Sequence, residues 1–378
     1  MSTRGARSRS LGATSTGKGV SAAAWAIVDQ CGTVLAHSNG HDPRHPASLT
    51  KLATGLVLMN VIQNYNFGAI EAFVEVTTAA SALRGTSASL IAGDRLTPTQ
   101  ALHALLLPSG NDAAASIQSS CVTLECTHGS SPHPPRPFLG RMAAAACQAR
   151  GRGRGGRRRP AALDTKHPTP AHSHTACCSA PSTHCFANAH GLDAAGHRMS
   201  PIAAARLGAA ALQHCGTAQA MCTAEYTTTV HSCIGADSRV LTWRNTHEWV
   251  AKYGLMGSDK TASKPAKDQT CDGMCEPSTS IGSSGGSSLC GSNSGSCAEE
   301  HEEGGDPGEA WRGVPMAGQW RLLGGKTGFT RGAGYCLFTG LQAKQWQLHI
   351  AVLGSRSKGA RYTDTLRLAR QAQLAGLA

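Results

Sequence analysis

Apolar positions at two different spacings divide the chain into expected strands and expected helices. Two apolar runs flank the turn "DQCG" within residues 21–38, which predicts a β-hairpin. From about Ser48 to Gln63 apolar residues recur at helical spacing, and Ser48 stands where an N-cap or first-turn residue would lie. Near the other end, three strands are expected in "WRLLGGKTGFT", "GYCLFTGLQ" and "KQWQLHIAVLG", followed by an amphipathic helix in "ARYTDTLRLARQAQL".

Two further helices carry clear start signals. Thr97 is placed to act as an N-cap, with Pro98 at the first helical position and Gln100 completing a capping box. Ser200 and Pro201 repeat the arrangement. Strands at both chain ends with helices between them predict an α/β protein of the layered α+β type. Its antiparallel five-stranded sheet comes from both chain ends, is flanked by helices and carries an inserted, mainly helical subdomain.

Two stretches interrupt this pattern. Residues of about 126–181 are rich in Pro, His, Arg and Cys, and residues of about 255–318 are rich in Ser and Gly and then acidic. Neither has an apolar period, so both are expected to be low-complexity inserts without regular structure. We therefore expect residues 1–19 to be disordered or targeting-like and residues 20–378 to form a single domain around the two inserts.

The net charge of +12 is concentrated in one place, because "ARGRGRGGRRRP" alone contributes six arginines. Such a run can contact nucleic acid or can be a solvated basic insert. We favour the second interpretation and expect no nucleic-acid partner, because no ribonucleoprotein signature, zinc finger or aromatic platform accompanies the arginines.

The fifteen cysteines do not indicate a disulfide framework, because their number is odd and nine lie in or beside low-complexity stretches. "CDGMC" and "HSHTACC" lack the second pair that a zinc site needs, so no metal or other cofactor is expected. No apolar run is long enough to span a membrane. The first 20 residues are rich in Arg and Ser and contain no acids. That composition is typical of organelle transit sequences, a plastid being one destination, and fits an incomplete start equally well.

Three short boxes carry the candidate chemistry. Ser48 and Lys51 form S-x-x-K, Ser109–Asn111 form S-x-N, and Lys326–Gly328 form K-T-G. Each box alone is weak evidence. In this order they form the signature of penicillin-recognising serine enzymes. A Ser/His/Asp triad is not supported, because no G-x-S-x-G motif stands at a turn between an expected strand and an expected helix.

The sequence around the boxes narrows the family. It includes "HPASLTKLAT", "GTSASLIAGDRLTPTQALHALLLPSGNDAAASI", "FANAHGLDAAGHRMSPIAAARL" and "GGKTGFTRGAGYCL". These segments closely resemble the D-alanyl-D-alanine carboxypeptidases of peptidase family S11, which are low-molecular-mass penicillin-binding proteins with a β-lactamase/transpeptidase-like fold. Asn111 and Lys326 are 215 positions apart. Without the two inserts this separation is about 95 positions, which is close to the roughly one hundred positions that separate the second and third boxes in that family.

The resemblance implies a role for each residue of the boxes. Lys51, with its pKa lowered by burial, would take the proton of Ser48 as Ser48 attacks a carbonyl. Ser109 would relay a proton to the departing amine. The backbone N–H groups of Ser48 and Phe329 would form the oxyanion hole.

The remaining residues would bind the substrate. Asn111 would hold an amide of the substrate, while a charged Lys326 and the Thr327 hydroxyl would bind its terminal carboxylate. Gly328 would let the substrate backbone lie close to the strand edge. We read "HGLD", which ends at Asp193, as a structural loop.

The expected function is therefore a serine-type carboxypeptidase that cleaves the terminal D-alanine from peptidoglycan stem peptides or similar D-Ala-D-Ala peptides. β-Lactams would acylate it as inhibitors, and their release would be slow because the sequence lacks an E-x-x-L-N-like segment. The alternative is a catalytically impaired penicillin-binding-like scaffold. No C-terminal β-rich domain is expected. Family members work outside the cytoplasm, whereas this sequence shows no signal peptide, so the compartment is left unassigned.

Overall fold

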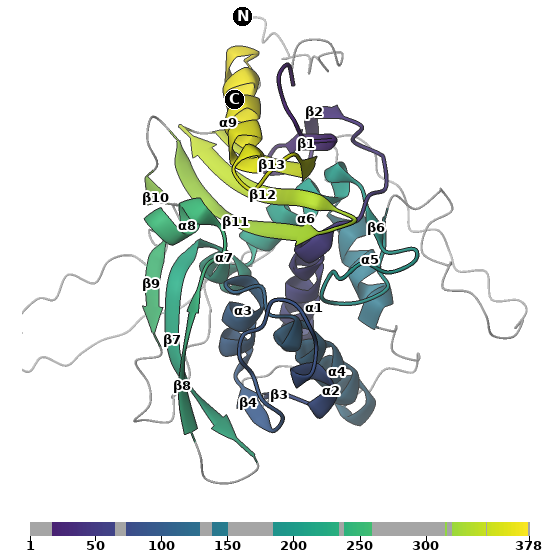
Figure 1. Ribbon diagram of the computed structural model, residues 1–378, viewed down its shortest axis with the longest axis vertical. Coiled ribbons are helices and arrows are strands. Elements are labelled where there is room, and N and C mark those ends of the chain that lie inside the picture. Colours follow the sequence, from purple (N-terminus) through teal and green to yellow (C-terminus); the bar gives the residue numbers. More distant parts are fainter. Residues whose placement is uncertain are drawn as a thin grey trace, which may run out of the picture.

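The main sheet of the protein combines both ends of the chain. We describe it from a computed structural model, which covers residues 17–64, 73–128, 138–149, 184–233, 238–258, 314–315, 320–344 and 346–376. Its antiparallel strands lie in the order β10-β11-β12-β13-β1-β2 (Figure 1). Their bounds are Val314–Pro315, Arg321–Thr330, Gly334–Ala343, Trp346–Ser355, Ala24–Val28 and Val34–Ser38.

The fold class expected from the sequence is confirmed. The N-terminal hairpin β1–β2 joins the C-terminal strands through β13, where Ile27 pairs with Ile350. The two-residue strand β10 adds a sixth strand at the edge that was not expected. It pairs only with Arg321 and Leu322 of β11, so the half of β11 from Lys326 to Thr330 is left free of β10.

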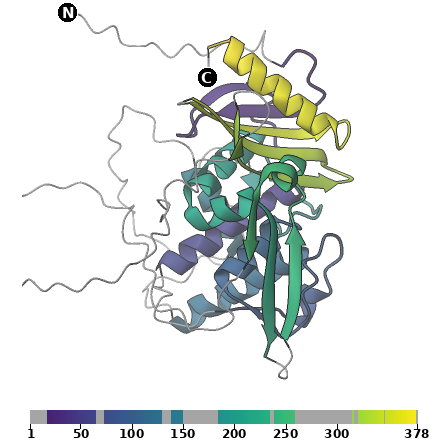
Figure 2. The ribbon, with the colours of Figure 1, turned by 90° about the vertical axis from the view of Figure 1, so that its left-hand side faces the viewer.

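Helices cover both faces of this sheet. Helix α9 (Ala360–Leu374) packs on the outer face against β12 and β13, and α6 (Pro201–Gln213) packs on the inner face (Figures 1 and 2). Gly208 of α6 permits the close approach, because a Cβ there would overlap the ring of Phe338. The start signals at Ser200 and Thr97 are confirmed, since each hydroxyl accepts a hydrogen bond from its helix and Thr97 forms the capping box with Gln100.

Among the described residues, six further helices form a block beneath the inner face of the sheet (Figure 2). They are α1, α2, α3, α4, α5 and α7, with bounds Thr50–Asn64, Thr78–Ser81, Pro98–Leu106, Asn111–His128, Phe138–Gln148 and Cys215–Cys222. Helix α5 corrects the expectation of irregular chain over residues 126–181. Its buried Phe138, Met142, Ala145 and Ala146 follow a helical spacing that the Ala-rich composition concealed. The arginine run at 150–159 and the rest of that insert to residue 183 lie outside the described residues.

A second sheet lies beside the helical block, where the long β7–β8 hairpin extends away from the main sheet (Figure 1). Its strands β3, β4, β7, β8 and β9 have bounds Val74–Glu75, Asp94–Leu96, Thr223–Ser232, Ser238–Arg244 and Leu255–Ser258. Strand β9 and, farther along, β10 shorten the insert expected at 255–318, and residues 259–313 lie outside the described residues. Helix α8 (Glu248–Tyr253) connects β8 to β9. A small pair, β5 (His184–Cys185) and β6 (Arg198–Met199), completes the fold.

Candidate active site

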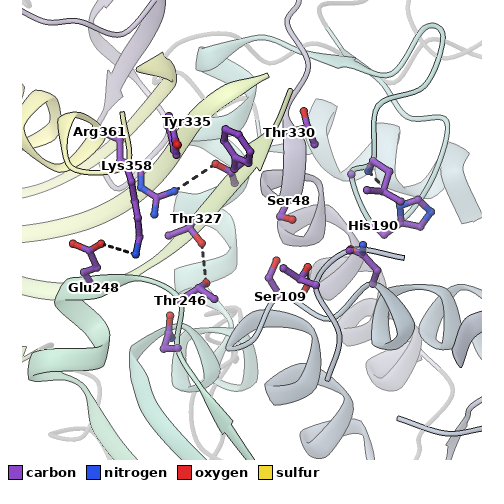
Figure 3. A pocket seen from close by; sticks show the side chains of 18 of the residues that line it. Ser48, Ser109, His190, Thr246, Glu248, Thr327, Thr330, Tyr335, Lys358 and Arg361 are labelled. Carbon is purple, nitrogen blue, oxygen red and sulfur yellow. Dashed lines mark hydrogen bonds and ion pairs between the residues drawn. The ribbon is translucent and has the colours of Figure 1, made fainter. Parts of the chain in front are cut away.

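The three boxes meet in one cleft of about 670 Å³ between β11, α8, the start of α9 and the helical block. Figure 3 shows Ser48 between Thr327 and His190, with Ser109 below it. The lining residues used below are Ser48, Ser109, Asn111, His190, Gly191, Thr246, Glu248, Thr327, Gly328, Phe329, Thr330, Lys358 and Arg361. The convergence that the sequence could only suggest is therefore present in the tertiary structure.

The nucleophile candidate stands on a tighter turn than expected. Ser48 lies in a 3₁₀ turn, Ala47–Leu49, and the α-helix α1 begins only at Thr50. The 3₁₀ geometry places side chains three residues apart almost directly above one another. Lys51 Nζ accordingly lies 3.1 Å from Ser48 Oγ, so the pairing expected from S-x-x-K is present and Ser48 is not an N-cap.

Lys51 is held at the base of the cleft with its side chain fully buried. Its Nζ donates to Asn111 Oδ1 at 2.8 Å and to the backbone oxygen of His190 at 2.7 Å. Burial lowers the pKa of Lys51 to about 7, while the carboxylate of Asp112 acts in the opposite direction. An amine with this pKa is largely neutral just above neutral pH and can act as a base.

Asn111 holds the Lys51 amine as well as lining the cleft. Its Oδ1 accepts from Lys51, and its Nδ2 donates to the backbone oxygen of Arg84 at 2.7 Å. Gly85 allows that approach, because its φ is +99° and a Cβ there would lie 2.7 Å from Asn111 Nδ2. Asn111 is thus a positioning residue for Lys51, and its expected contact with the substrate amide stays a prediction.

Backbone strain marks two positions of the site. Ala47, directly before Ser48, has φ 48°, and Ser109 has φ 64°. For residues other than glycine such conformations cost of order 1–3 kcal/mol, and they concentrate at functional sites. The strain at Ser109 accompanies an unused group, because its buried Oγ has no hydrogen-bond partner among the described residues. A hydroxyl free to donate and accept is what a proton relay requires.

Ser109→Ala should slow acylation of Ser48 by about 100-fold, because it removes the relay while leaving Lys51 in place. The thermal midpoint should change little, since the Oγ has no partner to lose. Stopped-flow acylation by a chromogenic β-lactam and thermal unfolding would measure the two effects. Ser89→Ala is the matched control, because Ser89 also has positive φ (61°) but is exposed. An unchanged acylation rate would reject the relay.

The third box presents only part of its polar groups to the cleft. Thr327 Oγ1 lies 2.8 Å from Thr246 Oγ1 and lines the cleft, whereas Lys326 is 1% exposed and donates to the Thr327 backbone oxygen at 3.0 Å. Burial, with the nearby cations of Lys51 and Arg361, lowers the pKa of Lys326 well below its usual range. The expected charge on Lys326 is therefore disfavoured by its surroundings in the protein, and a bound carboxylate would favour it again.

Arg361 is a site residue that the sequence analysis missed. It lies in the first turn of α9, is 4% exposed and lines the cleft beside the third box. Its Nη1 lies 3.5 Å from the Gly328 backbone oxygen and 3.4 Å from that of Cys336, and its buried Nε has no partner among the described residues. A cation in the first turn opposes the helix dipole, and this conflict was the only available signal. A guanidinium stays charged at any physiological pH and suits a carboxylate ligand.

The proposed oxyanion donors lie on neighbouring segments. A Cβ at Gly328 would come within 3.1 Å of Ala47 Cβ and 3.2 Å of the Ser48 nitrogen, so β11 passes directly beside Ser48. Phe329, the next residue, lines the same cleft. This closeness is compatible with N–H groups of Ser48 and Phe329 pointing at one oxygen.

Several solved structures share the fold of this chain. The Streptomyces K15 DD-transpeptidase aligns with a TM-score of 0.58 and 19% identity over 94% of this chain and 98% of that one. A serine-to-alanine mutant of the same transpeptidase gives 0.58 and 20% with the same coverage. Penicillin binding protein 6B from Escherichia coli gives 0.55 and 19% over 94% of this chain and 78% of that one. At these identities the likeness establishes the fold.

Sequence comparison adds the family resemblance. A family model described as D-alanyl-D-alanine carboxypeptidase, the S11 peptidases, matches residues 12–122, which contain the first two boxes. The resemblance to the D-alanyl-D-alanine carboxypeptidases of family S11 is thereby confirmed over these residues, while the third box is located by the structure. No curated protein matches the chain. Among the described residues, no helix has the length and apolar character needed to cross a bilayer.

Proposed function

We propose that the chain is a serine-type D-Ala-D-Ala carboxypeptidase that removes the terminal D-alanine from peptidoglycan-like peptides through an acyl-enzyme on Ser48. The observation that carries this proposal is the 3.1 Å contact between Lys51 Nζ and Ser48 Oγ, beside a cleft lined by Ser109, Thr327 and Arg361. β-Lactams, which carry a carboxylate beside a reactive amide, would acylate the same serine.

Acylation follows from the positions of these groups. With the peptide carboxylate at Thr327 and Arg361, the scissile carbonyl reaches Ser48, and its oxygen is stabilised by the N–H groups of Ser48 and Phe329. Neutral Lys51 takes the Ser48 proton as the Oγ–carbon bond forms. The proton then passes through Ser109 to the nitrogen of the leaving D-alanine as the C–N bond breaks.

Deacylation uses the same groups in reverse, because water takes the place of the departed amine and Lys51 is again able to accept a proton. Glu248 is the carboxylate among the described cleft residues named above, and it is paired with Lys358 at 3.3 Å. Glu248 is engaged by Lys358, and no hydrogen bond or ion pair joins it to Ser48 or Lys51 among the described residues. We therefore expect penicillin to be released slowly.

The proposal is tested by two measurements on the full chain. A fluorescent penicillin should give a covalent adduct, and mass spectrometry should locate it on Ser48. A peptide ending in D-Ala-D-Ala should release D-alanine, and the same peptide ending in D-Ala-L-Ala should not. Adduct formation without D-alanine release would favour the alternative of an impaired penicillin-binding scaffold, and the lack of both would reject the function.

Loss of either basic side chain at the carboxylate end of the cleft should weaken substrate binding. Arg361→Ala and Lys326→Ala are each expected to raise the KM for a D-Ala-D-Ala peptide by about 10- to 100-fold, because one charge-assisted contact is removed. Steady-state kinetics on the free acid and on its C-terminal amide would check this, since the amide has no charge to lose. Arg370→Ala, an exposed position of the same helix, is the control. An equal effect on both peptides would reject the carboxylate assignment.

A further inference from the structure

The loop from Asn188 to Asp193 contacts the nucleophile, its base and the end of β11. The backbone oxygen of His190 accepts from Lys51 at 2.7 Å. Gly191 (φ +91°) packs on the residue before Ser48, because a Cβ there would overlap the Ala47 backbone oxygen. The Asn188 side chain closes the loop, since its Oδ1 accepts from Gly191 N at 2.7 Å and its Nδ2 donates to the Leu192 oxygen at 3.0 Å.

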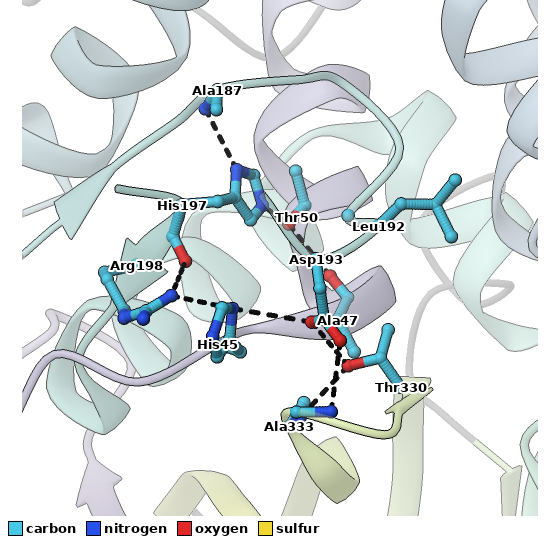
Figure 4. Close-up of polar contacts among 12 residues, drawn as sticks. His45, Ala47, Thr50, Ala187, Leu192, Asp193, His197, Arg198, Thr330 and Ala333 are labelled. Carbon is cyan, nitrogen blue, oxygen red and sulfur yellow. Dashed lines mark hydrogen bonds and ion pairs between the residues drawn. The ribbon is translucent and has the colours of Figure 1, made fainter. Parts of the chain in front are cut away.

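The carboxylate of Asp193 ties this loop to the end of β11, across about 140 positions of sequence (Figure 4). Its Oδ1 accepts from Thr330 Oγ1 at 2.7 Å, and its Oδ2 accepts from the Gly332 backbone N–H at 3.0 Å. Thr330 Oγ1 in turn accepts from Ala333 N at 3.0 Å. Thr330 directly follows Phe329, whose N–H is one of the two proposed oxyanion donors.

The segment leading to the nucleophile joins the same cluster. Arg198 Nη1 donates to His45 Nδ1 at 2.7 Å, and this ring nitrogen is 3.4 Å from Asp193 Oδ1. The His45 ring therefore lies between Arg198 and Asp193. His197, buried nearby, lies 2.9 Å from Thr50 Oγ1, which donates to the Ala47 oxygen at 2.8 Å. Both sides of the oxyanion hole are thus fixed to one loop.

We propose that Asp193 is the positioning residue of the oxyanion hole, holding the Phe329 N–H at the correct distance from the Ser48 N–H through Thr330 and Gly332. The inference rests on the proposed function and extends it to a residue outside the three boxes. Oxyanion donors act only at 2.7–3.1 Å from the developing charge, so a small displacement of the β11 end should lower the rate strongly. Substrate recognition at Thr327 and Arg361, which Asp193 does not contact in the structure, should be preserved.

The test compares Asp193→Ala, Asp193→Asn and Thr330→Val in the full chain. We expect Asp193→Ala to lower the rate constant of acylation by benzylpenicillin about 10- to 100-fold while its pre-covalent dissociation constant changes less than about two-fold. Affinity for an alkylboronic acid, whose tetrahedral adduct needs the oxyanion hole, should fall by a similar factor. Asp193→Asn, which keeps one acceptor oxygen, should be intermediate. Asp193→Ala and Thr330→Val should combine less than additively, because they share the Thr330 contact, while Asp193→Ala also removes the contact with Gly332. Asp42→Ala is the control, since the Asp42 side chain is exposed and makes a long ion pair of 4.0 Å with Arg44.

Several results would overturn the inference. One is that Asp193→Ala leaves both the acylation rate and the boronic-acid affinity unchanged. Another is that Asp193→Ala changes only the pre-covalent dissociation constant of benzylpenicillin. If Asp193→Ala fails to fold, Thr330→Val decides alone, and wild-type acylation by that variant would reject the inference. A wild-type chain that penicillin does not acylate would instead overturn the proposed function, and with it this extension. Wild-type acylation combined with unaffected variants would leave the proposed function standing and remove only the role of Asp193.

Discussion

Ser48→Ala is expected to abolish covalent labelling by penicillin and the release of D-alanine. Removing the serine nucleophile of a serine hydrolase costs about six orders of magnitude in rate, which leaves no measurable adduct. The fold should persist, because Ser48 Oγ contributes one side-chain hydrogen bond, from Lys51. Intact-mass spectrometry after incubation with benzylpenicillin, with circular dichroism on the same sample, measures both outcomes.

Ser81→Ala provides the matched control. Ser81 lies in α2, and its Oγ donates to the backbone oxygen of Thr78 in the same helix at 3.0 Å. Labelling of this control should equal that of the wild type. An adduct of the same mass in Ser48→Ala would show that another residue is the nucleophile and would contradict the site.

Lys51→Met should lower the acylation rate by about three orders of magnitude, because a positioned general base contributes 10²–10⁴-fold. In the wild type, the apparent second-order rate constant for acylation should rise with pH around a midpoint near 7, since burial lowers the pKa of Lys51 to about 7. A pH series from 5.5 to 8.5 with benzylpenicillin would measure this. The residual activity of Lys51→Met should lack that midpoint. Lys344→Met, an exposed substitution, is the control.

The same pKa shift has a stability consequence that can be measured without substrate. The unfolded chain holds the Lys51 proton up to about pH 10.4, whereas the folded chain releases it near pH 7. Between these values the unfolded state binds more protons, so the free energy of unfolding rises with pH by up to about 1.4 kcal/mol per pH unit. Relative to Lys51→Met, the wild type should therefore gain stability from pH 7 to 9. A flat difference would show that Lys51 is charged in the fold.

Local sequence rules were sufficient for most elements. The capping box at Thr97, the Ser200 start and the hairpin around "DQCG" depend on neighbours within a few positions, and all are confirmed. Helix α5 was missed because an alanine-rich helix inside a Pro- and Arg-rich stretch shows little apolar contrast. The shift of the α1 start from Ser48 to Thr50 was also missed, because the 3₁₀ turn depends on β11 and the loop at Gly191 packing against Ala47.

The amino-acid sequence by itself determined which residues could carry the chemistry, since hydroxyl and amine groups at fixed short spacing are local properties. Only the tertiary structure decided that the three boxes meet, that Arg361 joins them from the last helix, and that the His190 oxygen and Asp193 hold the base and the strand end. These contacts join positions up to hundreds of residues apart. The pKa of Lys51 depends on them too, because burial is a property of the packed chain and not of the residue.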